Sequence, residues 1–188
     1  MRISILLALV AATGSLGADQ RLSRMTAIYE KVCLSAFPDD NAVEALMKTQ
    51  DARELSPAEV KVTMNADPAR GWELVDGKAT VWLELPPFHA CSVRWNTQSI
   101  DDLGIYRTVA DAYESAKGGF KPMKTFDSDH GDIHVHAVGE QRTLPSQAVE
   151  SLFVIDQHIT DARRRDVGET GVVLRFVHQI TQPPNGSK

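Results

Sequence analysis

Six side chains that can bind a metal ion lie within ten consecutive residues. They are Asp127, Asp129, His130, Asp132, His134 and His136. Residues 133–138 alternate in a way that predicts a strand, so His134 and His136 project from the same face. His130 can approach them from the preceding turn. Because three imidazoles with one open position are a known zinc arrangement, His130, Asp132, His134 and His136 are a candidate zinc site, although the sequence as a whole predicts no cofactor.

A second interpretation of this segment involves no metal. The same residues fit a solvent-exposed strand that follows an acidic turn, and metal sites usually draw their ligands from more than one segment. The sequence contains no HExxH helix. If a zinc ion binds, it lowers the pKa of a bound water and makes that water a nucleophile for hydrolysis.

His89, Cys91 and Ser92 have the residue types of a nucleophilic site, in which an imidazole activates a thiol or a hydroxyl. The three are neighbours in sequence, and no glycine-rich turn surrounds Ser92. A cysteine in a disulfide provides no thiolate. We therefore expect no nucleophile here, and the sequence assigns no catalytic residue.

Glu73 and Glu84 lie on two predicted strands that flank a turn at Asp76 and Gly77. Two such carboxylates could act on a glycosidic bond, or they could form the polar face of an ordinary hairpin. Trp82 has the strand parity of Glu84 and the opposite parity to its apolar neighbours, so it belongs to that polar face. If Trp82 is exposed, it forms a candidate interaction surface with Glu73 and Glu84; the alternative is that Trp82 is an ordinary core residue.

The sequence contains two cysteines, Cys33 and Cys91, and an even number favours a disulfide in an exported chain. Cys33 lies on the apolar face of a predicted helix, 20–37. Cys91 has the inward parity of a predicted strand, 91–95. We therefore predict a structural bridge that joins helix to sheet.

Residues 1–18 have the features of a cleavable signal peptide. Arg2 gives a short positive start, residues 5–12 are all apolar, and residues 13–18 are mostly small. The apolar run is shorter than the ~20 residues that cross a bilayer. We predict export to the periplasm or the medium, with no membrane anchor after cleavage behind Gly17 or Ala18.

Charge and length limit the partners and the number of domains. Without residues 1–18 the chain has 19 basic and 25 acidic residues, a net charge of −6. An acidic surface repels nucleic acid, so we expect no nucleic-acid partner. The length suits a single domain, predicted as 19–180 with a flexible polar tail at 181–188. The sequence leaves the oligomeric state open.

Hydrophobic periodicity and turn signals predict the remaining elements. Helices are expected at 20–37, 39–49 and 102–117, with a third helix of at least one turn that begins at Ser56, and strands at 72–74, 79–85, 91–95, 133–138, 151–159 and 171–180. The third helix has a start signature at Ser56 and Glu59, although 60–64 alternates like a strand. The order lacks regular βα alternation, which predicts an α+β fold with N-terminal helices packed on a mainly antiparallel sheet.

No set of residues in the sequence converges on a recognisable activity. We therefore expect an exported, non-catalytic binding module that uses the exposed face of its sheet to bind a protein or a cell-envelope ligand. Two alternatives stay open. One is a metal-binding protein or metal-dependent hydrolase that uses His130, His134 and His136. The other is an immunity-like inhibitor whose acidic surface neutralises a basic enzyme outside the cytoplasm.

Overall fold

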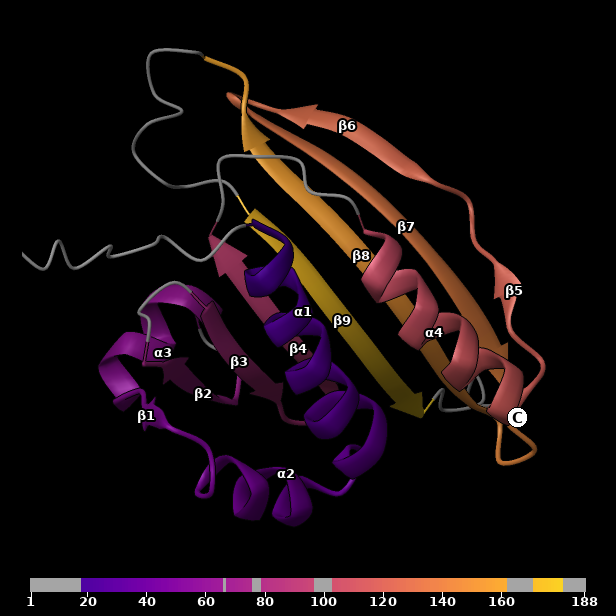
Figure 1. Cartoon of the computed structure of the whole chain (residues 1–188), viewed down its shortest axis with the longest axis horizontal. Coiled ribbons are helices and arrows are strands. Elements are labelled where there is room, and N and C mark those ends of the chain that lie inside the picture. The colour runs from indigo at the N-terminus through magenta and orange to yellow at the C-terminus, as the bar shows by residue number, and fades with distance from the viewer. Residues whose placement is uncertain (1–17, 66, 76–78, 97–102, 162–170, 181–188) are drawn as a thin grey trace, which may run out of the picture.

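A nine-stranded antiparallel sheet with helices packed against it forms the framework of the computed structural model of this protein (Figure 1). The structure describes residues 18–65, 67–75, 79–96, 103–161 and 171–180. Residues 1–17 of the predicted signal peptide and the predicted tail at 181–188 lie outside these ranges. The observed elements confirm the predicted α+β class, with N-terminal helices that precede the sheet.

The helical segments of the described ranges are α1 (Ala18–Tyr29), η1 (Glu30–Ala36), α2 (Asp40–Met47), α3 (Pro57–Met64) and α4 (Gly104–Lys117). η1 is a π-helix that continues α1 directly, and at its end the Phe37 N–H donates to the Val32 carbonyl at 3.0 Å. The predicted helix 20–37 is therefore one helical segment whose winding changes after Tyr29. No helix within the described ranges is long and apolar enough to cross a membrane.

The strands form two meanders that meet at their last strands. They are β1 (Ala52–Glu54), β2 (Ala69–Leu74), β3 (Ala79–Glu84), β4 (Ala90–Asn96), β5 (Lys121–Pro122), β6 (Phe126–His130), β7 (Ile133–Thr143), β8 (Ala148–Ile159) and β9 (Gly171–Ile180). The spatial order is β1-β2-β3-β4-β9-β8-β7-β5, and β6 also pairs with β7. The antiparallel pairing of β4 with β9 joins the two meanders, and α4 connects them in the chain.

Side-chain caps explain where the short helices begin. At the start of α2, the Asp39 carboxylate accepts a hydrogen bond from the Ala42 N–H at 3.1 Å. α3 begins with the predicted capping box, in which the Glu59 carboxylate accepts from the Ser56 N–H at 2.8 Å. Although residues 60–64 alternate like a strand, they continue the helix that begins at this cap, and α3 has eight residues.

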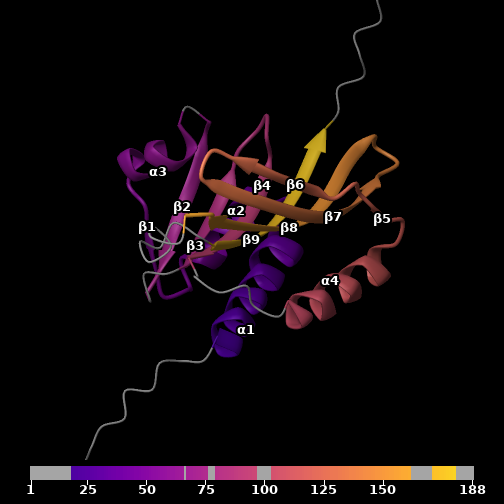
Figure 2. The ribbon, with the colours of Figure 1, turned by 90° about the horizontal axis from the view of Figure 1, so that it is seen from above.

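The register divides the sheet into two faces, which we call the helix face and the distal face. On the helix face, Cys91 of β4 lies opposite Phe176 of β9. On the distal face, Ser92 of β4 lies opposite Trp82 of β3 and Arg175 of β9. Figure 2 shows α1 and α4 together on one side of the sheet. α3 packs at the edge of the sheet, against β2.

The hydrophobic core lies between the helix face and the helices. Tyr29, Val32 and Tyr106 from the helices and Leu83 and Phe176 from the sheet are all buried, with at most 1% of their surface exposed. The rings of Tyr29 and Tyr106 lie 6.0 Å apart, where α1 packs against α4. Burial of apolar surface contributes about 25 cal/mol per Å² to the free energy of folding. The apolar residues of the N-terminal helix recur at helical spacing because they form the face that packs in this core.

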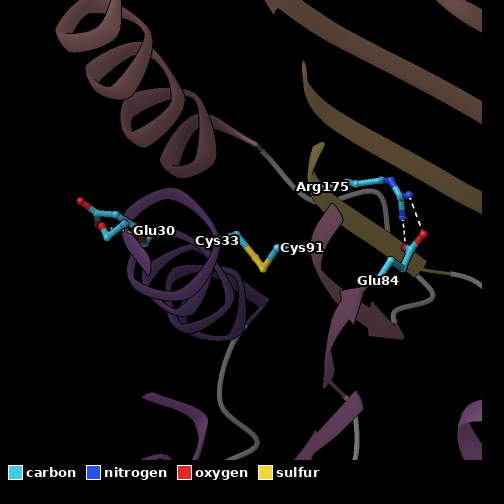
Figure 3. The surroundings of a disulfide bond; sticks show 6 residues. Glu30, Cys33, Glu84, Cys91 and Arg175 are labelled. Atoms are coloured by element: carbon cyan, nitrogen blue, oxygen red, sulfur yellow. Dashed lines mark hydrogen bonds and ion pairs between the residues drawn. A yellow bond between two sulfur atoms is a disulfide. The ribbon is translucent and has the colours of Figure 1, made fainter. Parts of the chain in front are cut away.

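The predicted disulfide joins Cys33 of η1 to Cys91 of β4 (Figure 3). Both cysteines are fully buried, and their Cα atoms are 5.3 Å apart, within the usual range for a disulfide. The bridge closes a loop across a sequence separation of 58. It ties the helical layer to the centre of the sheet, and the prediction of a bridge from helix to sheet is confirmed.

Three strands have no counterpart in the sequence prediction. β1 and β5 contain three and two residues, too few to show a period. β6 contains Asp127, Ser128 and Asp129, whose residue types favour turns. The segment forms a strand because it pairs with β7 over five positions, and tertiary pairing overrides local strand propensity. The turn expected before His134 is therefore limited to Gly131 and Asp132, and Asp127 and Asp129 belong to a strand.

Replacing both cysteines by alanine should lower the free energy of unfolding by about 4 kcal/mol, because the unfolded chain regains the freedom of a long loop. Urea unfolding followed by circular dichroism measures the change. Reduction of the unaltered protein is the matched control, since it breaks the cross-link and keeps both side chains. A loss below about 1 kcal/mol in both experiments would contradict a structural role for the bridge.

Candidate functional site

Three histidines and three aspartates lie on the helix face at one end of β6, β7 and β8. We call them the His–Asp cluster, and its members are Asp127, Asp129, His134, His136, Asp156 and His158. Alternate residues of a strand share a face, and the register places each of these side chains opposite another member. The β6–β7 hairpin extends past the first turn of α4 (Figure 1). The cluster is correspondingly accessible, with 69% of the Asp129 side chain exposed.

The two histidines of β7 each direct Nδ1 at an aspartate of β6. His134 Nδ1 lies 2.8 Å from Asp129 Oδ1, and His136 Nδ1 lies 2.9 Å from Asp127 Oδ2. The other oxygen of Asp127 lies 3.4 Å from His134 Nε2. The Asp127 carboxylate therefore stands between the two imidazoles, with one oxygen toward each.

His158 and Asp156 of β8 are the two members of the cluster that the sequence prediction did not include. His158 lies beside His134. Its ring centroid lies 4.9 Å from that of His134. Its Nδ1 atom is 3.7 Å from Asp156 Oδ2, beyond hydrogen-bond distance. That nitrogen is buried and has no hydrogen-bond partner among the described residues. Only the β7–β8 register brings His158 next to His134, and no local pattern encodes that register.

The structure does not bring all four predicted metal ligands together. His134 and His136 share the helix face, as predicted. His130 belongs to β6 and has distal-face parity, and its ring stacks on Phe126 with centroids 5.7 Å apart. Asp132 lies in the turn that follows, where its backbone carbonyl accepts from the Thr160 N–H at 2.9 Å. The separation arises because 126–130 is a strand and not a turn.

Hydrogen bonds within the cluster shift two pKa values. The bond to Asp129 raises the pKa of His134 above its usual value, and the charges of Asp127 and Asp129 act in the same direction. The bond to His136 holds the pKa of Asp127 below its usual value. Carboxylate-paired imidazoles can exchange protons near neutral pH and can bind metal ions. As the side chains stand, no three histidine, cysteine, aspartate or glutamate residues of the described ranges are placed to hold a metal ion.

A second polar group lies at the centre of the distal face. We call it the arginine centre, and it consists of Trp82, Glu84, Ser92, Arg94 and Arg175. The register places Trp82, Ser92 and Arg175 in one row across β3, β4 and β9. Figure 3 shows Glu84 and Arg175 on the opposite side of these strands from the disulfide. The arginine centre is therefore separated from the core by the sheet itself.

Trp82 lies on the predicted face but is buried, with 3% of its surface exposed. Its ring lies over Gly71, where an added Cβ atom would come within 2.8 Å of both the ring and Leu55. The indole Nε1 donates to Thr80 Oγ1 at 2.9 Å. Trp82 is therefore a packed side chain that borders the arginine centre, and its indole N–H is hydrogen-bonded within the protein.

The two arginines of the centre differ in their partners. Arg175 makes two bonds to Glu84, of which Nη2 to Oε2 measures 2.8 Å. Arg94 lies over the Trp82 ring, 5.7 Å from its centroid. Within the described part of the chain no carboxylate forms an ion pair with Arg94, and its Nε is buried without a hydrogen bond. Burial lowers the pKa of Arg94 and Arg175 adds to this, while Glu84 opposes it.

Glu73 and Glu84 do not form a carboxylate pair. The register places Glu73 opposite Thr80 and Glu84 opposite Ala69. The two positions are therefore separated by ~13 Å along the strands, at ~3.3 Å per residue. Glycosidases hold their two carboxyl groups about 5 to 9.5 Å apart. Glu73 instead binds Arg53, with Nη2 to Oε2 at 2.7 Å.

His89, Cys91 and Ser92 are also separated in space. Cys91 is in the disulfide, as expected, and is not available as a thiolate. The Ser92 side chain belongs to the distal face, and its buried Oγ has no hydrogen-bond partner within the described ranges. His89 Nε2 lies 2.8 Å from Asp40 Oδ1 of α2. These three residues therefore have three different surroundings.

No protein-family model, no curated protein and no solved structure matches this chain. Two groups of residues have the chemistry of a functional site. They are the His–Asp cluster at one end of the helix face, and the arginine centre with its surroundings on the distal face.

Replacing Glu84 by glutamine should lower the free energy of unfolding by about 2–4 kcal/mol, because it leaves Arg175 beside Arg94 without a counter-charge. The pair is largely buried, with 10% of the Glu84 and 21% of the Arg175 side chain exposed. Urea unfolding gives the values. The matched control is the double variant Glu84→Gln with Arg175→Met, which should recover at least half of the loss. Equal losses in both variants would contradict this electrostatic explanation.

Replacing Asp129 by asparagine should lower the pKa of His134 toward the usual value of about 6.5. In the unaltered protein, protonated His134 stabilises the fold at pH values below the pKa that His134 has in the unfolded chain. This stabilisation is lost as the pH rises through the higher pKa of His134 in the folded protein. An NMR titration of the imidazole Cε1–H in metal-free protein measures the pKa. Asp111→Asn, on an exposed site of α4, should leave it unchanged. A wild-type His134 that titrates at or below the usual value would refute the assignment.

Proposed function

We propose that this chain is an exported, non-catalytic binding module whose distal face binds a protein partner at the cell envelope. One observation carries the proposal. α1, η1 and α4 pack on the helix face (Figure 2), while the distal face between β4 and β6 presents apolar side chains beside Arg94, which forms no ion pair with a carboxylate of the described residues.

Apolar side chains form a continuous row on the distal face. The register aligns Val173, Ile155, Ala137 and Phe126 across β9, β8, β7 and β6. The row covers three strand spacings, or ~14 Å. Exposure rises along it, from 8% at Val173 to 47% at Phe126. Contiguous apolar side chains on an accessible face are typical of interaction surfaces.

Arg94 lies at the inner end of this row, opposite Val173. A guanidinium that has lost part of its water shell is stabilised by a carboxylate, which it can bind through two parallel hydrogen bonds. Arginine and aromatic residues are also enriched in protein interfaces. The chemistry of this face therefore favours a partner that presents an acidic side chain flanked by apolar ones.

Two features support a location outside the cytoplasm. Residues 1–18 have the composition of a signal peptide. The disulfide is compatible with an oxidising compartment, where such bonds form and persist. A protein of the periplasm or the medium would meet its partner at the envelope.

The alternative of an acidic inhibitor that binds a basic enzyme would use a different surface. This alternative is motivated by the net charge of the whole chain, whereas the distal face holds Arg94, which has no ion-pair partner within the described ranges. A basic partner would be repelled by Arg94. The distal face therefore favours the binding module over the inhibitor, and the location of the contact distinguishes the two.

Site-specific photocrosslinking in the envelope fraction of the source cells tests this function. A crosslinking residue at Ile155, on the distal face, should give an adduct of one defined mass. The same residue at Ala112, which is exposed on α4, is the matched control and should give none.

A second substitution tests the role of Arg94 in the same experiment. Arg94→Gln should reduce the Ile155 adduct at least about tenfold, because losing a charge-assisted hydrogen bond costs about 1.5 kcal/mol or more, whereas Arg94→Lys should retain part of the adduct. Adducts of equal strength from Ile155 and Ala112, or an Ile155 adduct that ignores Arg94→Gln, would contradict binding at the distal face.

A further inference from the structure

We propose that the His–Asp cluster is a zinc site with His134, His158 and Asp127 as its ligands. The site is independent of the proposed binding at the distal face. It also differs from the set that the sequence predicted, because His158 of β8 takes the place of His130 and because Asp127 contributes an oxygen.

Two of the three ligands already have the spacing of a metal site. A tetrahedral zinc ion holds its nitrogen and oxygen ligands at ~2.0–2.2 Å, so two such ligands stand roughly 3.4 Å apart. His134 Nε2 and Asp127 Oδ1 are 3.4 Å apart. This distance is long for a hydrogen bond between charged groups, and it matches the separation of two ligands that share one zinc ion.

The second ring nitrogen of His134 and the second carboxylate oxygen of Asp127 are hydrogen-bonded, as is usual for the ligands of a zinc site. A metal-binding histidine usually donates its second ring N–H to a carboxylate, which fixes the tautomer and the ring orientation. Asp129 occupies this position at His134 Nδ1, at 2.8 Å. His136 fixes the second oxygen of Asp127 at 2.9 Å. Asp129 and His136 are therefore positioning residues.

His158 supplies the third ligand from the neighbouring strand. Its ring lies beside that of His134, with centroids 4.9 Å apart, and its buried Nδ1 has no hydrogen-bond partner among the described residues. Ligands from β6, β7 and β8 meet the requirement that metal sites combine several segments. Two imidazoles and one carboxylate suit zinc better than calcium or magnesium, which prefer oxygen ligands.

Zinc binding requires a limited movement, because the three groups do not converge as they stand. The His158 side chain is 34% exposed and that of His134 is 26% exposed. A change of rotamer at the accessible end of the cluster needs no rearrangement of the core. The fourth position would remain open to water.

Isothermal titration of tag-free, chelator-treated protein with zinc chloride tests the site. The unaltered chain should bind one zinc ion. His134→Gln, His158→Gln and Asp127→Asn should each weaken binding more than about tenfold, and Asp129→Asn by about tenfold or more through its effect on His134. His130→Gln, on the other face of the hairpin, is the matched control and should leave the affinity within about twofold, because no ligand is lost.

An NMR titration of the unaltered protein gives the answer even if a variant fails to fold. Zinc should shift the imidazole resonances of His134 and His158 and leave those of His130 and His89 in place. The site would be overturned by the absence of saturable binding at millimolar zinc, or by equal losses in His130→Gln and His158→Gln. Shifts confined to other histidines would also overturn it.

Discussion

The pairing of β4 with β9 is the constraint on which the rest of this structure depends. Seven residue pairs join two strands that lie far apart in the chain, and they turn two separate meanders into one sheet. A slip of one residue would exchange the two faces of β9. Phe176 would then leave the core, and Arg175 would enter it without Glu84. The disulfide at Cys91 on one face and the Glu84–Arg175 ion pair on the other (Figure 3) fix the same orientation of these central strands.

This arrangement assigns different roles to the two faces. The helix face is closed by α1, η1 and α4, and its stability comes from buried apolar side chains and the disulfide. The distal face carries the arginine centre and the apolar row, whose side chains pack mostly on their own sheet. The His–Asp cluster belongs to the helix face but lies at its end, near the tip of the β6–β7 hairpin. The sheet separates the arginine centre from the core, and the His–Asp cluster lies beyond the end of the helical layer, so neither polar group is part of the core.

Sequence patterns predicted the parts of the fold that depend on neighbouring residues. The helical period of 20–37, the capping box at Ser56 and Glu59 and the inward parity of Cys91 are all local signals. They were sufficient for the α+β class and for the disulfide. β6 was missed because its polar residues have turn-forming types, and only its partner strand makes it extended.

The candidate site was predicted only in part, and for the same reason. His134 and His136 share a face because they are two residues apart on one strand. His158 lies in the His–Asp cluster, and Arg175 in the arginine centre, because of cross-strand register. In each case the paired position, His134 or Ser92, is more than twenty residues away in sequence. Such a register is set by the whole sheet, so the sequence placed His130 in the site and left His158 out.

The helices cover one face of the sheet and leave the distal face around Ile155 and Ala137 accessible. Solvent paramagnetic relaxation enhancement of methyl groups in the isolated protein measures this directly. Ile155 and Ala137 of the distal face should relax strongly with a soluble gadolinium probe, whereas Val154, with 4% of its surface exposed on the helix face, should be protected. Equal protection of Ile155 and Val154 would show that the distal face is covered within the chain, and would contradict the account.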